Sequence, residues 1–304
     1  MPESEAALEG WLHVPDIDTL SQTFCNSDEY KTLQNSAANL VRPPINPLDW
    51  PACFIESHVD AVTLESLINH VEESWTFLGE TEPFYSVLTT PSFLKSSFDQ
   101  NRTSFYESAQ RDIDRLSAFA ARAGVALPLN GMAFEFGCGV GRVTRLLGKV
   151  FARVIAADIS ASHLLLAEQM VTSNNASEHV SFRLLNKPAA IFEVRDYDFF
   201  FSVMVLQHNP PPVMAQILDA ALQGLNMGGF AYFQVPTYRL GYAFRSKDYL
   251  DNLGPKGNME MHVLPQKEVL SIIDRNRCKL LEVREDDYTG HEDGISNTFF
   301  LRKG

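Results

Sequence analysis

The sequence predicts an α/β fold with a doubly wound sheet of seven strands, mostly parallel with an antiparallel C-terminal strand, behind an N-terminal, mainly helical region. Three observations predict it. From residue 132 onward, short apolar runs alternate with stretches whose apolar residues recur at helical spacing. A glycine-rich segment follows the first of these runs, and the last two runs are joined by a short loop. The 304 residues, 45% of them hydrophobic, can form one core with an additional layer.

The chain is predicted to contain three regions. Residues 1–58 are acidic and punctuated by prolines, which predicts an acidic tail or extended arm. Residues 59–128 carry apolar residues at helical spacing and are predicted to form a helical lid or docking region. Residues 129–304 are predicted to hold the sheet. Within them, 236–262 is an insertion rich in aromatic residues and glycine.

The predicted strands and helices alternate along the third region, which favours a parallel arrangement of the first five strands. The strands are expected at 132–136, 153–157, 180–184, 199–205, 230–235, 280–286 and 297–301. The helices are expected at 142–151, 161–173, 212–225 and 266–275. The third helix begins with prolines, which the first turn tolerates because its N–H groups have no intrahelical partner.

Composition argues against several classes of function. The net charge is −13 and the pI is near 5.0, whereas a nucleic-acid partner would require a basic surface. No basic start followed by an apolar stretch opens the chain, and the most apolar run, 199–206, is too short to cross a membrane. The four cysteines show no C-x-x-C pairing, so neither a zinc site nor a disulfide framework is expected. The cytoplasm is the expected location.

A glycine-rich turn joins the first predicted strand to the next helix. Gly137, Gly139 and Gly141 allow the backbone to turn sharply and to approach a ligand closely. A dinucleotide-binding loop reads G-x-G-x-x-G, and its third glycine would fall at Arg142. Glu135 precedes the first glycine by two residues, and its carboxylate would repel a pyrophosphate but suit an ammonium group. The loop therefore disfavours a nicotinamide cofactor.

The pattern E-x-G-x-G-x-G at 135–141 resembles motif I of the class I S-adenosylmethionine-dependent methyltransferases, which have a Rossmann-like fold. The resemblance covers roughly 132–304 and includes the closing strand pair. It implies S-adenosylmethionine as cofactor and S-adenosylhomocysteine as product. It further implies that Asp158 binds the ribose hydroxyls, that Ile159 packs on the adenine and that Asn186 faces the adenine amino group. The other cofactor-binding residues that it implies are Glu135, Gly137, Cys138, Gly139, Gly141, Leu206 and Gln207, together with Arg102 and Tyr106 of a lid.

Methyl transfer from a sulfonium is an in-line displacement, so the protein mainly has to align the reacting atoms in a dry site. A hydroxyl acceptor must also lose its proton, and histidine is the usual base near neutral pH. The candidates are His208, which follows the fourth strand, and His262, at the end of the insertion, with Glu260 as a further carboxylate. The alternatives are a structural role in its own loop for His208, a link from the insertion to the core for His262, and a solvated carboxylate for Glu260.

The insertion is the predicted acceptor side. Tyr238, Arg239 and Tyr242 are the expected substrate residues, because aromatic faces and hydroxyls suit a sugar or an aromatic ring and arginine suits a carboxylate or phosphate. The expected reaction is therefore methylation of a hydroxyl on a small molecule or saccharide. The alternative for these aromatic residues is a lid or a contact between two copies of the chain, as in a homodimer.

Other functions stay open at this point. They are a small-molecule N-methyltransferase, a nicotinamide-dependent oxidoreductase and a non-catalytic cofactor-binding scaffold. The segment 209–212 approaches the motif of amino-group methyltransferases that act on bases, but it ends in Pro212 where an aromatic residue would stack on the base. No nucleic-acid partner is therefore expected. No metal is expected either, because the histidines and acidic residues lack ligand spacing.

Overall fold

The computed structural model describes residues 49–173, 177–187, 189–290 and 292–304. The chain divides into two compact units, Met1–Pro51 and Ala52–Gly304, and the second unit contains the sheet together with the helices that precede it. The predicted arm at 1–58 lies mostly outside the described residues.

The region before the sheet is mainly helical, as predicted. It consists of α4 (Ala61–Thr81), a short 3-10 helix η2 (Pro91–Phe93), α5 (Phe98–Glu107) and α6 (Ala109–Arg122). Helix α4 begins where the side chain of Asp60 accepts a hydrogen bond of 2.8 Å from the backbone N–H of Thr63, which satisfies one of the free donors of the first turn.

The seven-stranded sheet is confirmed, with the order β3-β2-β1-β4-β5-β7-β6. The first five strands are parallel, and β7 lies antiparallel between β5 and β6. The order of the strands reverses between β1 and β4, which marks the position where open parallel sheets bind ligands. The strands are β1 (Met132–Phe136), β2 (Arg153–Asp158), β3 (Val180–Leu184), β4 (Tyr197–Ser202), β5 (Leu225–Arg239), β6 (Cys278–Asp286) and β7 (Gly294–Lys303).

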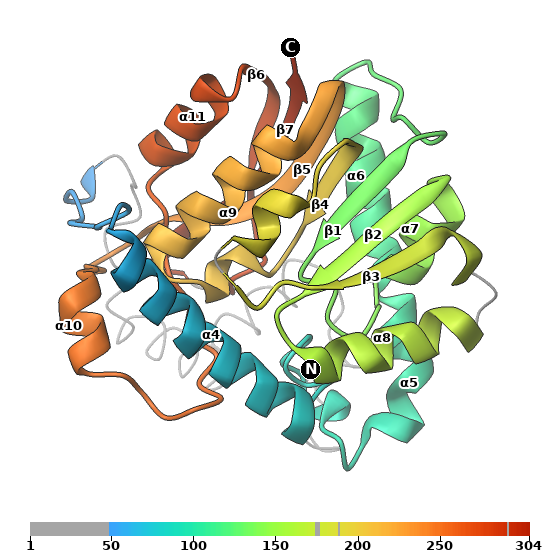
Figure 1. Ribbon diagram of the computed structural model, residues 1–304, viewed down its shortest axis with the longest axis horizontal. Coiled ribbons are helices and arrows are strands. Elements are labelled where there is room, and N and C mark those ends of the chain that lie inside the picture. Colours follow the sequence, from blue (N-terminus) through green and yellow to red (C-terminus); the bar gives the residue numbers. More distant parts are fainter. Residues whose placement is uncertain (1–48, 174–176, 188, 291) are drawn as a thin grey trace, which may run out of the picture. The chain divides into compact units, whose positions relative to one another are not determined.

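Helices cover both faces of this sheet (Figure 1). Helix α9 packs with α11 on one face, and α6 packs with α7 on the other. These helices and the remaining ones are α7 (Thr144–Val150), α8 (Ala161–Ser173), η3 (Ser177–His179), η4 (Ala190–Glu193), η5 (Leu206–His208), α9 (Pro211–Gly224), α10 (Ser246–Asp251) and α11 (Gln266–Arg275). Coverage on both faces explains why the run at 199–201 is continuously apolar.

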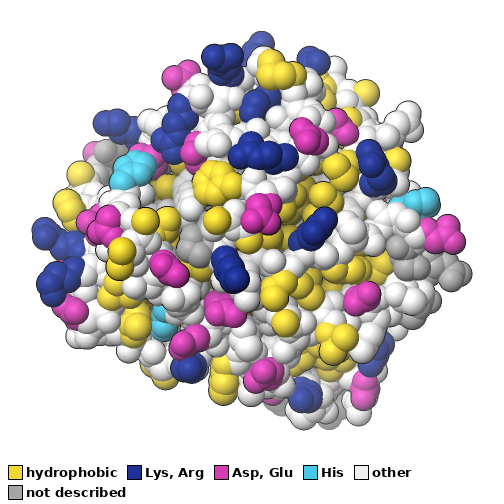
Figure 2. Space-filling view, viewed as in Figure 1, with side chains coloured by type: hydrophobic (Ala, Val, Ile, Leu, Met, Phe, Trp, Pro, Cys, Tyr) yellow, Lys and Arg dark blue, Asp and Glu magenta, His cyan; other side chains and the backbone are white. Residues whose placement is uncertain are grey.

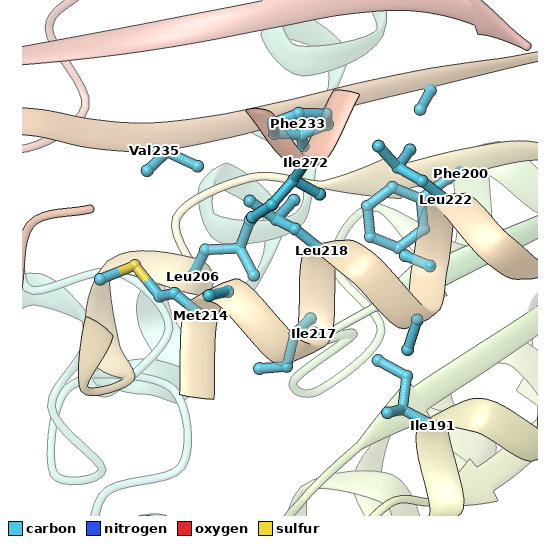
Figure 3. Close-up of a cluster of buried hydrophobic side chains, with 14 of the residues drawn as sticks. Ile191, Phe200, Leu206, Met214, Ile217, Leu218, Leu222, Phe233, Val235 and Ile272 are labelled. Carbon is cyan, nitrogen blue, oxygen red and sulfur yellow. The ribbon is translucent and has the colours of Figure 1, made fainter. Parts of the chain in front are cut away.

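The largest apolar cluster lies between the sheet and α9 (Figure 3). Phe200 of β4 and Phe233 of β5 are fully buried there against Leu218 and Leu222 of α9, and Ile272 of α11 closes the cluster. These contacts fix the position of α9 and therefore of the loop that leads into it from β4.

Strand β5 is longer than predicted. It begins at Leu225 and continues to Arg239, so the first residues of the predicted insertion at 236–262 are part of the sheet. The extension forms because β7 pairs along it, with Tyr238 opposite Ile295 and Arg239 opposite Gly294. A pairing partner so distant in the sequence leaves no local signal.

None of the helices among the described residues combines the length and the hydrophobicity needed to cross a bilayer. On the face shown in Figure 2, Lys and Arg side chains lie among Asp and Glu side chains, and hydrophobic side chains reach the surface between them.

Candidate active site

A cavity opens at the carboxyl ends of the parallel strands, where the strand order reverses. Its volume is about 1130 Å³, including the solvent at its mouth. Helix α4 contributes Ile68, Val71 and Trp75 to the wall, and α9 contributes Val213, Gln216 and Ile217. The polar side chains on the wall are those of Ser86, Glu135, Arg142, Asp158, His163, Lys187, His208, Asn209 and Gln216.

The glycine loop requires left-handed backbone at all three glycines. The φ angles are +77° at Gly137, +53° at Gly139 and +79° at Gly141, a region that other residues rarely adopt. A Cβ on Gly137 would lie 2.2 Å from Val205 Cγ1, and one on Gly141 would lie 3.1 Å from Ala167 Cα. The glycines therefore allow the loop to pass between the end of β4 and helix α8.

Glu135 is a buried carboxyl on the wall of this cavity. It is 3% exposed, and the hydroxyl of Thr144 donates a hydrogen bond of 2.6 Å to Oε2. Burial raises the pKa of Glu135 to about 7, and the hydrogen bond from Thr144 and the charge of Arg142 oppose that rise. A cationic group entering the cavity would stabilise the ionised form.

Arg142, which the sequence singled out only as a missing glycine, is a second buried charge on the wall. Its Nη2 donates to Asp112 Oδ2 at 2.6 Å, and its Nη1 donates to the hydroxyl of Ser108 at 3.3 Å. The hydroxyl of Tyr288 donates to the other oxygen of Asp112 at 3.0 Å. The Nε–H of Arg142 is buried and has no hydrogen-bond partner among the described residues.

Asp158 ties the end of β2 to the glycine loop. Its Oδ2 accepts from the backbone N–H of Gly139 at 2.8 Å, and its Oδ1 accepts from that of Ser160 at 2.9 Å. A carboxylate oxygen accepts more than one hydrogen bond, so ligand hydroxyls can still donate to this group. Ile159 and Leu185 follow on the apolar wall of the same cavity.

His208 is the predicted catalytic residue that reaches the cavity. Its Nδ1 lies 2.9 Å from the carbonyl oxygen of Glu260, and its Nε2 lies 3.2 Å from Nε2 of Gln207. Burial lowers the pKa of His208 to about 4. The indole of Trp75 contacts its ring edge to face, with centroids 5.2 Å apart.

His262 and Glu260 form a hydrogen-bonded cluster that does not line the cavity. The hydroxyl of Tyr242 lies 2.8 Å from His262 Nδ1, and His262 Nε2 lies 3.2 Å from Glu260 Oε2. Tyr249 donates its hydroxyl to the same carboxylate oxygen at 2.6 Å. The hydrogen bond from His262 is the main reason that the pKa of Glu260 is lowered.

Several of the other predicted site residues lie off the cavity wall. Asn186 donates to Glu72 at 3.4 Å, and Arg102 is an exposed side chain that pairs with Asp99. Tyr106 is buried against the carbonyl of Val140, under the glycine loop. Cys138 is a predicted residue that does line the cavity. The predicted residues that do not line it also include Gly141, Leu206, Gln207, Tyr238, Arg239 and Tyr242.

His163 is a cavity residue that the sequence reasoning missed. It is 1% exposed, its Nε2 lies 3.0 Å from the hydroxyl of Ser86, and its Nδ1 has no hydrogen-bond partner among the described residues. Its position in the first turn of α8, five residues after Asp158, was the available signal. No group of three His, Cys, Asp or Glu side chains in the described part of the chain is placed to hold a metal ion.

Comparison with known proteins agrees with this geometry. Residues 133–229 match the family described as the methyltransferase domain. This segment is a methyltransferase domain. The matched segment runs from β1 into the start of β5 and so includes the glycine loop, Asp158 and His208.

Solved structures share the fold of this methyltransferase at low sequence identity. Magnesium protoporphyrin IX methyltransferase from Synechocystis PCC 6803, solved with bound SAH, is 15% identical, with a TM-score of 0.53 over 79% of this chain and 100% of that one. A putative sarcosine dimethylglycine methyltransferase from Galdieria sulphuraria is 12% identical, with a TM-score of 0.50 over 66% of this chain and 87% of that one. No curated protein matches the sequence.

Proposed function

We propose that this methyltransferase transfers the methyl group of S-adenosylmethionine to a hydroxyl oxygen of a small molecule with an apolar body. The observation that carries the proposal is a single cavity that begins at the glycine loop and extends past the end of β4. Its charged groups lie after the ends of β1, β2 and β3, and the wall formed by α4 and α9 is largely apolar.

The residues at the ends of β1 and β2 fit the cofactor. We assign the ammonium group of its methionine part to Glu135 and the carboxylate to the guanidinium of Arg142. We assign the ribose hydroxyls to Asp158 and the adenine to the apolar surface of Ile159 and Leu185. When bound, S-adenosylmethionine supplies an electrophilic methyl group on a sulfonium sulfur. The protein positions the acceptor in line with it and excludes water.

The apolar wall favours a small acceptor with an apolar body over a saccharide. Ile68, Val71 and Trp75 of α4 face the cavity together with Val213 and Ile217 of α9. Such a surface would leave the many hydroxyls of a sugar without hydrogen-bond partners, at a cost for each buried group. The aromatic residues of the insertion, on which the saccharide prediction rested, do not line this wall.

An amine is the second candidate acceptor, and one observation favours it. Both ring nitrogens of His208 lie within hydrogen-bonding distance of other protein groups. A hydroxyl requires removal of a proton during transfer, whereas the neutral form of an amine already carries a free lone pair.

The proposal is tested with a panel of phenols, aliphatic alcohols, amines and sugars, each incubated with the protein and S-adenosylmethionine. Mass spectrometry of the acceptors is expected to show the gain of one methyl group on an apolar alcohol or phenol. Methylation of amines alone would replace the first candidate with the second, and methylation of sugars alone would contradict the argument from the apolar wall. Asp158→Ala is expected to abolish product formation, and Glu168→Gln, at an exposed position on α8, is the matched control.

A further inference from the structure

We propose that Gln234 is a positioning residue that holds His208 at the cavity wall as a neutral imidazole with its proton on Nδ1. In this state His208 shapes the site but does not remove a proton from the acceptor. The meaning for catalysis rests on the proposed function, whereas the state of the ring is a property of the protein alone.

The chain of hydrogen bonds begins at a backbone donor that cannot change its direction. The N–H of Met204 donates to Gln234 Oε1 at 3.1 Å. Met204 has a φ of +58°, a left-handed conformation that is uncommon outside glycine, and it lines the cavity directly after β4. Turning the amide of Gln234 around would bring its NH₂ group against this N–H. The oxygen of Gln234 is therefore fixed toward Met204.

The orientation of the Gln234 amide determines the direction of the hydrogen bonds that lead to His208. The NH₂ group of Gln234 must donate its two hydrogens to Gln207 Oε1, at 3.1 Å, and to the hydroxyl of Ser296, at 2.7 Å. Gln207 then presents its own NH₂ group to His208 Nε2, at 3.2 Å. That nitrogen must accept, so it carries no proton.

The opposite side of the ring leads to the same assignment. His208 Nδ1 lies 2.9 Å from the backbone oxygen of Glu260, which can only accept, so Nδ1 carries the proton. The Glu260 side chain is itself held by Tyr249 and His262, and the backbone N–H of His262 donates to the carbonyl of Gln207 at 2.7 Å. The contacts of Glu260 and His262 thus hold in place the Glu260 carbonyl that lies against Nδ1 of His208.

Among the described residues, no charged side chain forms a hydrogen bond with the imidazole. His262, after β5, lowers the pKa of His208, and the carboxylate of Glu260 in the same segment is occupied by His262 and Tyr249. The titratable groups that line the same cavity are Glu135, Arg142, Asp158, His163 and Lys187. From α4 the ring meets the uncharged indole of Trp75. A neutral ring at this wall also avoids repulsion of a sulfonium in the same cavity.

The state of the ring is measured by long-range ¹H–¹⁵N correlation spectra of protein labelled at histidine, without cofactor. A His208→Asn variant identifies the signals. We expect the Nδ1–H tautomer, with no titration between pH 5.5 and pH 8. A proton on Nε2, or titration near the ordinary histidine pKa of about 6.5, would overturn the proposal, and neither outcome depends on the methyl acceptor.

Gln234→Glu is expected to reverse the direction of the hydrogen bonds between residue 234, Gln207 and His208. The introduced carboxylate accepts from Met204 and can no longer donate to Gln207, whose amide must turn and present its oxygen to His208. His208 then carries protons on both nitrogens, and its signals should titrate between pH 5.5 and pH 8. The matched control is Gln169→Glu, at an exposed position on α8, which should leave the spectrum unchanged. A folded Gln234→Glu variant with an unchanged His208 would refute the role of Gln234.

Gln207→Leu provides a second variant if the buried carboxylate prevents folding. It removes the donor to Nε2 but leaves the carbonyl of Glu260 in place, so the proton is expected to remain on Nδ1. Loss of that tautomer in Gln207→Leu would contradict the part assigned to Glu260.

The effect on the site is measured by comparing the affinities of S-adenosylmethionine and S-adenosylhomocysteine, which differ in the charge on sulfur. In Gln234→Glu the affinity for S-adenosylmethionine relative to S-adenosylhomocysteine is expected to fall about fivefold between pH 8 and pH 5.5, and to stay constant in the natural protein. A constant ratio in a variant whose His208 is protonated would overturn the inference that a charge on His208 acts on the sulfonium in the same cavity.

Discussion

The replacement Glu135→Gln tests the role of the buried carboxyl in the cavity. It separates the effect of this charge on the stability of the protein from its effect on cofactor binding. The carboxyl is 3% exposed and accepts one hydrogen bond, from Thr144. Burial is the main reason that its pKa rises from 4.5 to about 7. The folded protein therefore binds a proton at this group more tightly than the unfolded chain does.

The sign of the effect on stability follows from this raised pKa. Between about pH 4.5 and pH 7 the unfolded chain has lost the proton of Glu135 and the folded chain has kept it. The free energy of unfolding therefore falls as the pH rises through this window and levels off above it. The raised pKa of Glu135 lowers the free energy of unfolding by about 1 kcal/mol at pH 5 and by about 3 kcal/mol at pH 8.

Glutamine keeps an oxygen that accepts from Thr144 but carries no charge at any of these pH values. Relative to the natural protein, Glu135→Gln should therefore gain about 2 kcal/mol more in the free energy of unfolding at pH 8 than at pH 5. Urea unfolding at the two pH values measures this difference, and contributions of other titrating groups cancel. Glu168→Gln, at an exposed position on α8, should show no such difference. An equal stability change at both pH values would refute the argument.

The same substitution should weaken cofactor binding. S-adenosylmethionine and S-adenosylhomocysteine both carry the ammonium group that we assign to Glu135, so both should lose about tenfold in affinity at pH 7.5. Calorimetry in buffers with different ionisation enthalpies should also show proton release on binding at pH 6 to the natural protein and less release to Glu135→Gln. Greater stability at pH 8 with unchanged affinity would place the ammonium group elsewhere.

Three further predictions concern residues around the cavity. Asp112→Ala leaves Arg142 buried without its carboxylate partner and should cost about 3 kcal/mol in urea unfolding, whereas a cost below 1 kcal/mol would show that the pair is solvated. Gly137→Ala places a Cβ 2.2 Å from Val205 at a φ of +77°, and it should lower the melting temperature by about 5 °C and abolish cofactor binding in calorimetry. Trp75→Ala should raise KM for the acceptor more than it lowers cofactor affinity, and equal losses would assign the indole to the cofactor.

Much of the fold was predictable because its signals are local. The run at 132–136 coincides with β1, whose central residues are buried between two layers of helices. The run at 180–184 coincides with β3, an edge strand in which apolar and polar residues alternate and none is fully buried. The glycine pattern at 137–141 was equally informative, because only glycine adopts left-handed backbone at such close spacing without strain. The length of β5 was not predictable, because its last residues are held by β7, more than fifty residues further along the chain.

The sequence by itself determined the type of sheet and the position of the glycine loop, since both depend on residues close together in the chain. Only the tertiary structure decided which side chains reach the cavity. His163 lies there because Gly79 of α4 allows that helix to approach it, and Gln234 governs His208 through Gln207. Hydrogen bonds across such separations are fixed only when the sheet and its helices have packed, and the direction in which each amide donates is determined there.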